Sequence, residues 1–336
     1  MPVVVSTVPK WRFDTSKVEL PSEWTVTFIN PASEAELITA CQGADCLLVL
    51  ASFPEVTAPV LQQIGHIKLI QAVGAGYDRI DSKAAAEAGI PVANVPGANA
   101  KTVAEFAVGS IIALQRQLLV ADREVKAGRY AGIRQGLLKD GLNEIAGSVV
   151  GLVGLGAIGR QTARILKFLG ASVYYYSRSG KSVTLEAELD IHYKSLTELL
   201  TECNVISIHV PLNEETRGLI GKAEMSLMQP GSLLINTARG EVIDQPALAD
   251  MLEQGHLAGA AVDVTYPEPP ANGHPLLTLS PGARDRLLIT PHIAGVTVGA
   301  FRCMLDQALQ NIDRVLNNEV PWHVVNGVAI NKREEG

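Results

Sequence analysis

Residues 149–160 read Val149-Val150-Gly151-Leu152-Val153-Gly154-Leu155-Gly156-Ala157-Ile158-Gly159-Arg160, and this stretch decides the fold class. Its apolar start predicts a buried strand, and the GxGxxG pattern leads into a helical stretch that ends at Gly170. In such a unit Gly154 permits a tight turn, Gly156 lets backbone N–H groups approach a pyrophosphate, and Gly159 allows close packing of helix on strand. Glycine triplets also occur in structural turns, so the flanking strand and helix carry the prediction of a dinucleotide site.

Strand and helix patterns alternate on both sides of this stretch. Short β-branched runs lie at 2–6, 25–30, 46–50, 68–73 and 91–95, with helical patterns near 33–43, 57–64 and 81–88, and a second series of runs lies at 149–154, 172–177, 205–210, 232–238, 258–264 and 287–291. This alternation is typical of parallel α/β sheets. A helical pattern from Asn99 to Ala127 separates the two series, and we expect one long helix that bridges two domains and offers a subunit contact.

The length of 336 residues suits two doubly wound parallel-sheet domains. We expect a discontinuous domain of 1–98 and 291–336, to which the helical pattern at 297–318 returns, and a domain of 99–290 inserted in it. An active site in the cleft between the domains is expected, with closure around the substrate.

Composition excludes several classes of protein. A net charge of −7 argues against a nucleic-acid partner, because phosphate binding needs clustered Lys and Arg. No apolar run has the length of a membrane span, and the N-terminus lacks the features of a signal peptide. The four cysteines are scattered, which suits free thiols in a reducing compartment. A cytoplasmic protein that binds no membrane is therefore expected.

The strand candidate at 172–177 ends in a basic loop. An Asp or Glu usually binds the ribose hydroxyls about twenty residues after the glycine pattern, but the chain there reads Ser177-Arg178-Ser179. These donors suit a 2′-phosphate, and Lys181 adds a further positive charge nearby. A solvated basic loop is the alternative interpretation.

Three later segments carry candidate catalytic residues at strand ends. Asn236-Thr237-Ala238-Arg239-Gly240, Val262-Asp263-Val264 leading to Glu268, and Thr290-Pro291-His292-Ile293-Ala294-Gly295 each follow a strand candidate. Ligands of open α/β sheets bind at such ends. Arg239 offers a planar fork that matches a carboxylate, whereas His292 can give and take a proton near neutral pH. Glu268 suits the role of partner to the other imidazole nitrogen.

Each of these residues also has a structural interpretation. A lone Arg239 is more often a surface residue, His292 alone more often a structural histidine, and Glu268 between two prolines can be an exposed turn. Asp263 is either a structural hydrogen-bond acceptor or a cofactor contact, and we favour the second. The remaining histidines considered, at positions 192, 209, 256 and 274, show no spacing that indicates a metal, so we expect none.

In these motifs the chain resembles the D-2-hydroxyacid dehydrogenase family, and glyoxylate and hydroxypyruvate reductases in particular. The matching segments occur in order along nearly the whole chain: Val73-Gly74-Ala75-Gly76-Tyr77-Asp78, Thr102-Val103-Ala104-Glu105, the glycine pattern at Gly154, His209-Val210-Pro211-Leu212, and the three segments above. Several ordered matches together are highly specific, although none is so alone.

The resemblance implies hydride transfer between a nicotinamide cofactor and a small 2-oxo or 2-hydroxy acid, such as glyoxylate or hydroxypyruvate. It implies a Rossmann-type cofactor domain inserted in a flavodoxin-like substrate domain, and a homodimer built on the bridging helix. The catalytic residues would be Arg239, Glu268 and His292, with NADP preferred and NAD also possible. The substrate would contact Val73, Gly74, Ala75, Gly76 and Arg239. The cofactor would contact Thr102, Gly154, Gly156, Ala157, Ile158, Gly159, Ser177, Arg178, Ser179, Val210, Pro211, Thr216, Thr237, Ala238, Arg239, Asp263, His292, Ala294 and Gly295.

Some residues depart from particular branches of the family. Residues 130–136 lack the tryptophan-rich pattern of several glyoxylate and hydroxypyruvate reductases. Residues 141–144 are faintly similar to phosphite dehydrogenase, but that enzyme would carry a lysine near Ala75. Formate dehydrogenases would place Gln where Glu268 stands. Ser52, Phe53 and the loop 75–77 are expected to shape the substrate pocket.

A protein of another class shares the resemblance. Nucleotide-sensing regulators similar to the C-terminal-binding corepressors have the same fold and would retain Arg239, Glu268 and His292. Such a regulator would bind the cofactor but turn over almost no 2-oxo acid, so steady-state kinetics separate the two classes.

Overall fold

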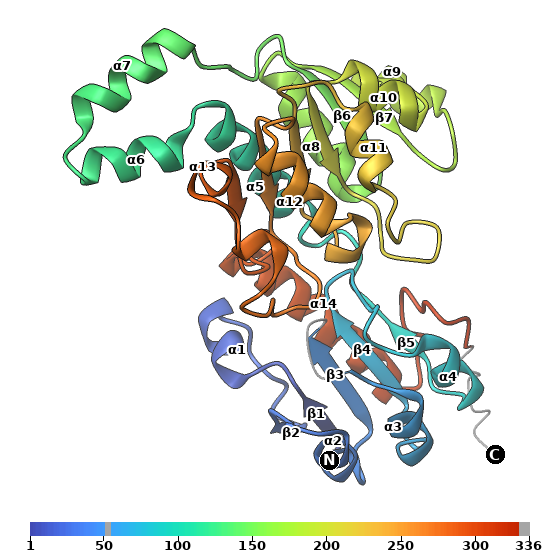
Figure 1. The fold of residues 1–336 in the computed structure, drawn as a ribbon. Coiled ribbons are helices and arrows are strands. Elements are labelled where there is room, and N and C mark those ends of the chain that lie inside the picture. The colour runs from blue at the N-terminus through green and yellow to red at the C-terminus, as the bar shows by residue number, and fades with distance from the viewer. Residues whose placement is uncertain (51–54, 329–336) are drawn as a thin grey trace. The chain divides into compact units, whose positions relative to one another are not determined.

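The computed structural model describes residues 1–50 and 55–328, and the chain divides into two compact units (Figure 1). Unit 1 comprises Met1–Asn99 with Val296–Gly336, and unit 2 comprises Ala100–Gly295. Among the described residues no single helix has the length and apolar composition needed to cross a membrane, although α5 (Ala100–Gln115) and α6 (Leu118–Lys126) pass that test together as a bent pair.

Unit 1 is a parallel sheet of five strands in the order β2-β1-β3-β4-β5. This is the strand order of flavodoxin-like folds. Its strands are β1 (Val3–Ser6), β2 (Thr25–Phe28), β3 (Cys46–Leu50), β4 (Leu69–Val73) and β5 (Val92–Ala93), and its helices are α1 (Lys10–Ser16), α2 (Glu34–Cys41), α3 (Ala58–Gln63), α4 (Ser82–Glu87) and α14 (Val298–Leu316). One apolar cluster joins the sheet to α1 and α14, and another joins it to α2, α3 and α4. Although α14 follows unit 2 in the chain, it packs on β4 of unit 1.

Unit 2 is a parallel sheet of seven strands in the order β12-β11-β10-β9-β6-β7-β8. Six of them reproduce the Rossmann order, and β12 extends the sheet at one edge. The strands are β6 (Val149–Val153), β7 (Ser172–Tyr176), β8 (His192–Tyr193), β9 (Val205–Ile208), β10 (Leu233–Asn236), β11 (Gly259–Val262) and β12 (Leu287–Ile289). Besides α5 and α6, its helices are α7 (Tyr130–Asp140), α8 (Ala157–Phe168), α9 (Val183–Leu189), α10 (Leu196–Glu202), α11 (Lys222–Leu227), α12 (Gln245–Glu253) and α13 (Pro281–Arg284). The predicted fold class of two parallel α/β sheets is therefore confirmed.

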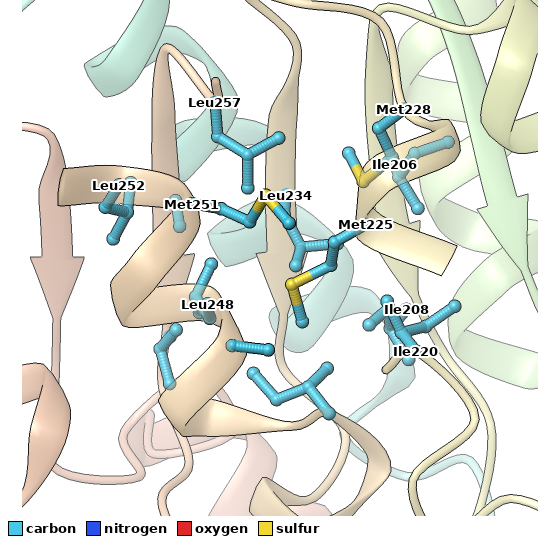
Figure 2. Close-up of a cluster of buried hydrophobic side chains, with 14 of the residues drawn as sticks. Ile206, Ile208, Ile220, Met225, Met228, Leu234, Leu248, Met251, Leu252 and Leu257 are labelled. Carbon is cyan, nitrogen blue, oxygen red and sulfur yellow. The ribbon is translucent and has the colours of Figure 1, made fainter. Parts of the chain in front are cut away.

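Both faces of the unit 2 sheet are covered by apolar side chains. Figure 2 shows one cluster, in which Ile206 and Leu234 from the sheet meet Met225 of α11 and Leu248 of α12. A second cluster covers the opposite face, where α5 and α8 pack. Strands buried on both faces need the continuous apolar runs that the sequence shows.

The helix predicted from Asn99 to Ala127 is interrupted. α5 ends at Gln115, and α6 starts at Leu118 after a bend of 59°. Gln117 adopts a left-handed conformation with φ 47°, which breaks the helical hydrogen bonding. α5 buries eight side chains, whereas α6 and α7 bury none. We refer to α6 and α7 together, Leu118–Asp140, as the arm; its two helices lie away from the sheet of unit 2 in Figure 1.

Candidate active site

The glycine turn after β6 is tightly packed where it faces the protein. Gly154 has φ 105°, and its N–H donates to Tyr176 O at 2.9 Å, which ties the turn to the end of β7. A Cβ atom on Gly154 would lie 2.6 Å from His209 O, and one on Gly159 would lie 2.3 Å from Gly154 O. Only glycine fits at these two positions, because real Cβ contacts to backbone are longer.

The same turn is open where α8 begins. Gly156 is the N-cap of α8, and no side chain caps the helix. A Cβ atom at Gly156 would have no neighbour within 4 Å. The exposed N–H groups and the helix dipole favour an anion at this position. The arrangement therefore fits the pyrophosphate of a dinucleotide, with Ala157 and Ile158 in the first turn of α8.

Three catalytic candidates follow adjacent strands of unit 2. β10 pairs with β11 and β11 with β12, all parallel, so their carboxyl ends lie at one edge of the sheet. Arg239 follows β10, Glu268 follows β11, and His292 follows β12. His292 Nδ1 and Glu268 Oε1 are 2.8 Å apart, which is a hydrogen bond between two partly exposed side chains. This pair matches the arrangement of an acid–base histidine held by a carboxylate.

The backbone on both sides of Arg239 is fixed by its neighbours. Asn236 Nδ2 donates to Arg239 O at 2.9 Å, and the Arg239 guanidinium donates through Nη1 to Ala238 O at 2.8 Å. A Cβ atom on Gly240 would lie 2.3 Å from the carbonyl carbon of Thr265, so the chain after Arg239 packs directly against the segment after β11.

Asp263 organises the loop that carries His292. Its carboxylate accepts hydrogen bonds from Thr290 Oγ1 at 2.6 Å, from Ile293 N at 2.8 Å and from Ala294 N at 2.8 Å. His292 N donates to Asp263 O at 2.8 Å, and His292 has a positive φ of 54°. Asp263 is only 2% exposed, and its carboxylate is a hydrogen-bond acceptor for the loop. The contact with a cofactor that the sequence analysis favoured for Asp263 stays a prediction.

Comparison with known proteins identifies the family. Residues 108–294 match the family model described as D-isomer specific 2-hydroxyacid dehydrogenase, NAD binding domain. The chain is 34% identical over 310 residues to a glyoxylate reductase of Aeropyrum pernix, an alignment that covers 91% of this chain and 90% of that enzyme. The chain belongs to the D-isomer specific 2-hydroxyacid dehydrogenase family. It is an oxidoreductase that depends on a nicotinamide cofactor.

Two solved structures extend the comparison to both nicotinamide cofactors. A formate dehydrogenase of Staphylococcus aureus in complex with NAD has a TM-score of 0.80 and 26% identity, covering 95% of this chain and 96% of that one. An acyclic imino acid reductase in complex with NADPH and D-Arg has a TM-score of 0.81 and 26% identity, covering 97% of this chain and 100% of that one. The shared fold thus accepts either cofactor.

The basic loop of this family member carries an ion pair. Arg178 Nη1 binds Glu215 Oε2, and both side chains are exposed. The Glu215 carboxylate raises the pKa of Arg178, first through the hydrogen bond and then through charge attraction. Ser177 Oγ and Ser179 Oγ lie 2.8 Å apart, so the two hydroxyls of the loop are neighbours. This ion pair was not predicted from the sequence, because Thr216 was selected but the neighbouring Glu215 was not.

Other selected residues lie at the edge of unit 2 where the strands end. Val210 and Pro211 follow β9, and Thr216 Oγ1 donates to Pro211 O at 2.6 Å. Thr237 follows β10, and its buried hydroxyl has no hydrogen-bond partner among the described residues. A buried hydroxyl without a partner at this edge fits contact with a bound molecule.

His209, between β9 and Val210, belongs to one of the segments that match the family, but no catalytic or binding role was predicted for it. It is 8% exposed, and burial lowers its pKa to about 4, so the ring is neutral at pH 7. Its Nε2 pairs with Ser207 Oγ at 2.9 Å, while Nδ1 has no partner within the described part of the chain. Residues 1–50 and 55–328 contain no group of three or more His, Cys, Asp or Glu side chains that could hold a metal ion.

Apart from Arg239, the residues selected for substrate contact lie in unit 1. Val73 ends β4, and Gly74 follows with φ 106°. Val95 N donates to Gly74 O at 2.8 Å, and Asn94 Nδ2 donates to Ala75 O at 2.7 Å. These bonds use the carbonyl groups of the loop. Thr102 lies in the first turns of α5, and Ser52 and Phe53 lie outside the described residues.

Proposed function

We propose that the protein reduces a small 2-oxo acid, such as glyoxylate or hydroxypyruvate, to the 2-hydroxy acid with NADPH as its preferred reductant. The observation that carries the proposal is the His292–Glu268 pair at the carboxyl edge of the unit 2 sheet. Its two residues follow β12 and β11, and β11 pairs with β10, the strand that Arg239 follows. The glyoxylate reductase of Aeropyrum pernix supports the substrate class.

The catalytic residues have two roles, proton donation and binding of the substrate carboxylate. The bound cofactor supplies the hydride that adds to the carbonyl carbon. Because Nδ1 of His292 is bonded to Glu268, Nε2 is the atom that donates a proton to the carbonyl oxygen, and the resulting imidazole is neutral after reduction. Glu268 stabilises the charged ring before transfer. Arg239 binds the substrate carboxylate and polarises the neighbouring carbonyl.

The two units take different parts of this task. Unit 2 binds the cofactor, with Gly154, Gly156 and the start of α8 at the pyrophosphate. Unit 1 supplies backbone N–H groups near Val73–Gly76 for the substrate carboxylate. Hydrogen bonds to the carbonyl groups of Gly74 and Ala75 hold this loop in place. Thr237, Ala238, Ala294 and Gly295, at strand ends of unit 2, line the nicotinamide side.

The preference for NADP rests on the end of β7. No carboxylate follows this strand directly to accept the ribose hydroxyls or to repel a 2′-phosphate. Ser177, Arg178 and Ser179 offer two hydroxyls and a guanidinium instead. The lost ribose contact is the only penalty against NAD, so we propose a preference and not an exclusion.

We also propose that the enzyme is a cytoplasmic homodimer, and the exposed arm supports the dimer. Leu118, Leu119, Val125 and Leu138 of the arm are exposed by 45% or more, and α6 and α7 have no buried residue. A cavity of about 760 Å³ lies at the base of the arm, lined among others by Gln115. Gln115 Oε1 is buried without a partner in the described part of the chain. A second copy would cover the apolar side chains and bind this polar atom.

A substrate panel tests the function. Glyoxylate, hydroxypyruvate, pyruvate, phenylpyruvate and 2-ketogluconate are each assayed with NADPH and with NADH. We expect turnover with at least one small 2-oxo acid and a higher kcat/KM with NADPH than with NADH. Cofactor binding with almost no turnover on the whole panel would instead indicate a regulator of the corepressor type.

A further inference from the structure

The ion pair between Arg178 and Glu215 spans the cofactor end of β6. In the strand order, β7 lies on one side of β6 and β9 on the other. Arg178 follows β7 and Glu215 belongs to the loop after β9, so the two side chains meet across the carboxyl end of the strand that carries Gly154. The two residues are 37 positions apart in the chain.

The loop that presents Glu215 is well ordered by its own hydrogen bonds. Asn213 Oδ1 accepts from Glu215 N and from Thr216 N, each at 3.0 Å. Thr216 Oγ1 accepts from Asn213 N at 2.9 Å and donates to Pro211 O at 2.6 Å. The backbone position of Glu215 is therefore set by the turn, and its carboxylate is held beside Arg178.

We infer that Glu215 is a specificity-determining residue that limits the preference for NADP. This inference rests on the proposed role of Arg178 at the 2′-phosphate. A 2′-phosphate competes with the Glu215 carboxylate for Arg178, and when bound it lies near a second negative charge. NADH lacks this phosphate, so its binding requires no exchange of the ion pair. Glu215 thus disfavours NADPH while leaving NADH almost unaffected.

The expected effect is moderate because both side chains are exposed, by 75% and 62%. Exposed charge pairs are screened by water and salt, so Glu215→Gln should tighten NADPH binding by about three- to tenfold. NADH binding should change by less than about twofold. Raising the ionic strength to about 1 M should remove most of the difference, since the Debye length then falls to about 3 Å.

The test is equilibrium binding of NADPH and NADH, followed by nicotinamide fluorescence without substrate. Wild type, Glu215→Gln, Arg178→Ala and the double variant form a thermodynamic cycle. Glu214→Gln is the matched control, because it removes the same charge from the adjacent exposed position. We expect Glu215→Gln alone to tighten NADPH binding, this gain to disappear in the Arg178→Ala background, and Glu214→Gln to have less than about a twofold effect.

The results separate this inference from the cofactor preference. A wild type that favours NADH would overturn the preference, yet a selective gain for NADPH in Glu215→Gln would still support the role of Glu215. Equal changes for both cofactors, no change for NADPH, or a gain that persists without Arg178 would each overturn the inference. An equal gain in Glu214→Gln would also overturn it, since the effect would then come from net charge alone.

Discussion

Gly156 and Gly159 lie three residues apart in one turn, but the structure assigns them different tasks. A Cβ atom on Gly159 would lie 2.3 Å from Gly154 O, a backbone atom that can move only with the turn. Gly159→Ala should therefore destabilise the fold by about 2 kcal/mol or more. For a unit of this size, that corresponds to a fall in melting temperature of about 4–8 °C.

Gly156→Ala should leave the fold nearly unchanged and weaken the cofactor site. A Cβ atom here meets nothing within 4 Å, and φ of −72° is accessible to alanine. The melting temperature without cofactor should thus stay within about 3 °C of wild type. The new methyl group would occupy the space where a pyrophosphate approaches the N–H groups of α8, so binding should weaken by at least about tenfold, or about 1.4 kcal/mol.

Thermal unfolding with and without NADPH, together with a fluorescence titration, measures both effects. The cofactor should raise the melting temperature of wild type and have little effect on that of Gly156→Ala at the same concentration. The reasoning is refuted if Gly156→Ala binds NADPH as wild type does, or if Gly159→Ala melts at the wild-type temperature.

Three further predictions concern catalysis, stability and assembly. His292→Ala should lower kcat by about 100-fold or more, with a much smaller effect on cofactor binding. Arg239→Lys should lower kcat/KM, because an ammonium cannot make the two-pronged carboxylate contact. Near-normal kinetics in both variants would exclude the assignment. Burial lowers the pKa of His209 to about 4, so below about pH 6.5 the unfolded chain binds more protons than the folded chain, and the free energy of unfolding falls as the pH is lowered. Between pH 7.5 and 5, urea unfolding should show a loss of stability about 2 kcal/mol larger in wild type than in His209→Gln. Equal losses in the two proteins would contradict this prediction. Leu119→Asp in the arm should shift the protein toward monomer in light scattering. Leu227→Asp in α11 should not, although Leu227 is 44% exposed and Leu119 is 45% exposed. A wild-type mass for Leu119→Asp would contradict the arm interface.

The sequence predicted the features that depend on local pattern and on parallel topology. Apolar runs and the glycine turn identified every strand of both sheets except β8, because most of these strands are buried on both faces and leave a continuous apolar pattern. β8 (His192–Tyr193) has only two residues and was not predicted. The prediction that Glu268 partners His292 followed from their positions after strand candidates, and the 2.8 Å contact is consistent with it. Both residues could be selected as catalytic candidates from the local sequence alone.

The features that the sequence did not reveal depend on long-range contacts. The bend at Gln117 has no glycine or proline to indicate it, and it occurs where α5 leaves the buried region beside α8. The hydrogen bonds of Asp263 were not predictable either, because its partners Thr290, Ile293 and Ala294 are 27 to 31 residues away in the chain. Hydrophobic periodicity predicts which face of a helix or strand is buried, but it does not predict which loops contact each other.

The order of strands in unit 2 separates the proposed chemistry from the proposed choice of cofactor. Arg239, Glu268 and His292 follow the adjacent strands β10, β11 and β12, whereas Arg178 and Glu215 follow β7 and β9 on either side of β6. The loops that we propose to decide between NADP and NAD are therefore different from the loops that hold the proposed acid–base pair. Exposed residues after β7 and β9 can change without repacking the buried Asp263 that fixes the His292 loop. If these assignments hold, a change of cofactor preference in this chain would need substitutions only in the loops after β7 and β9.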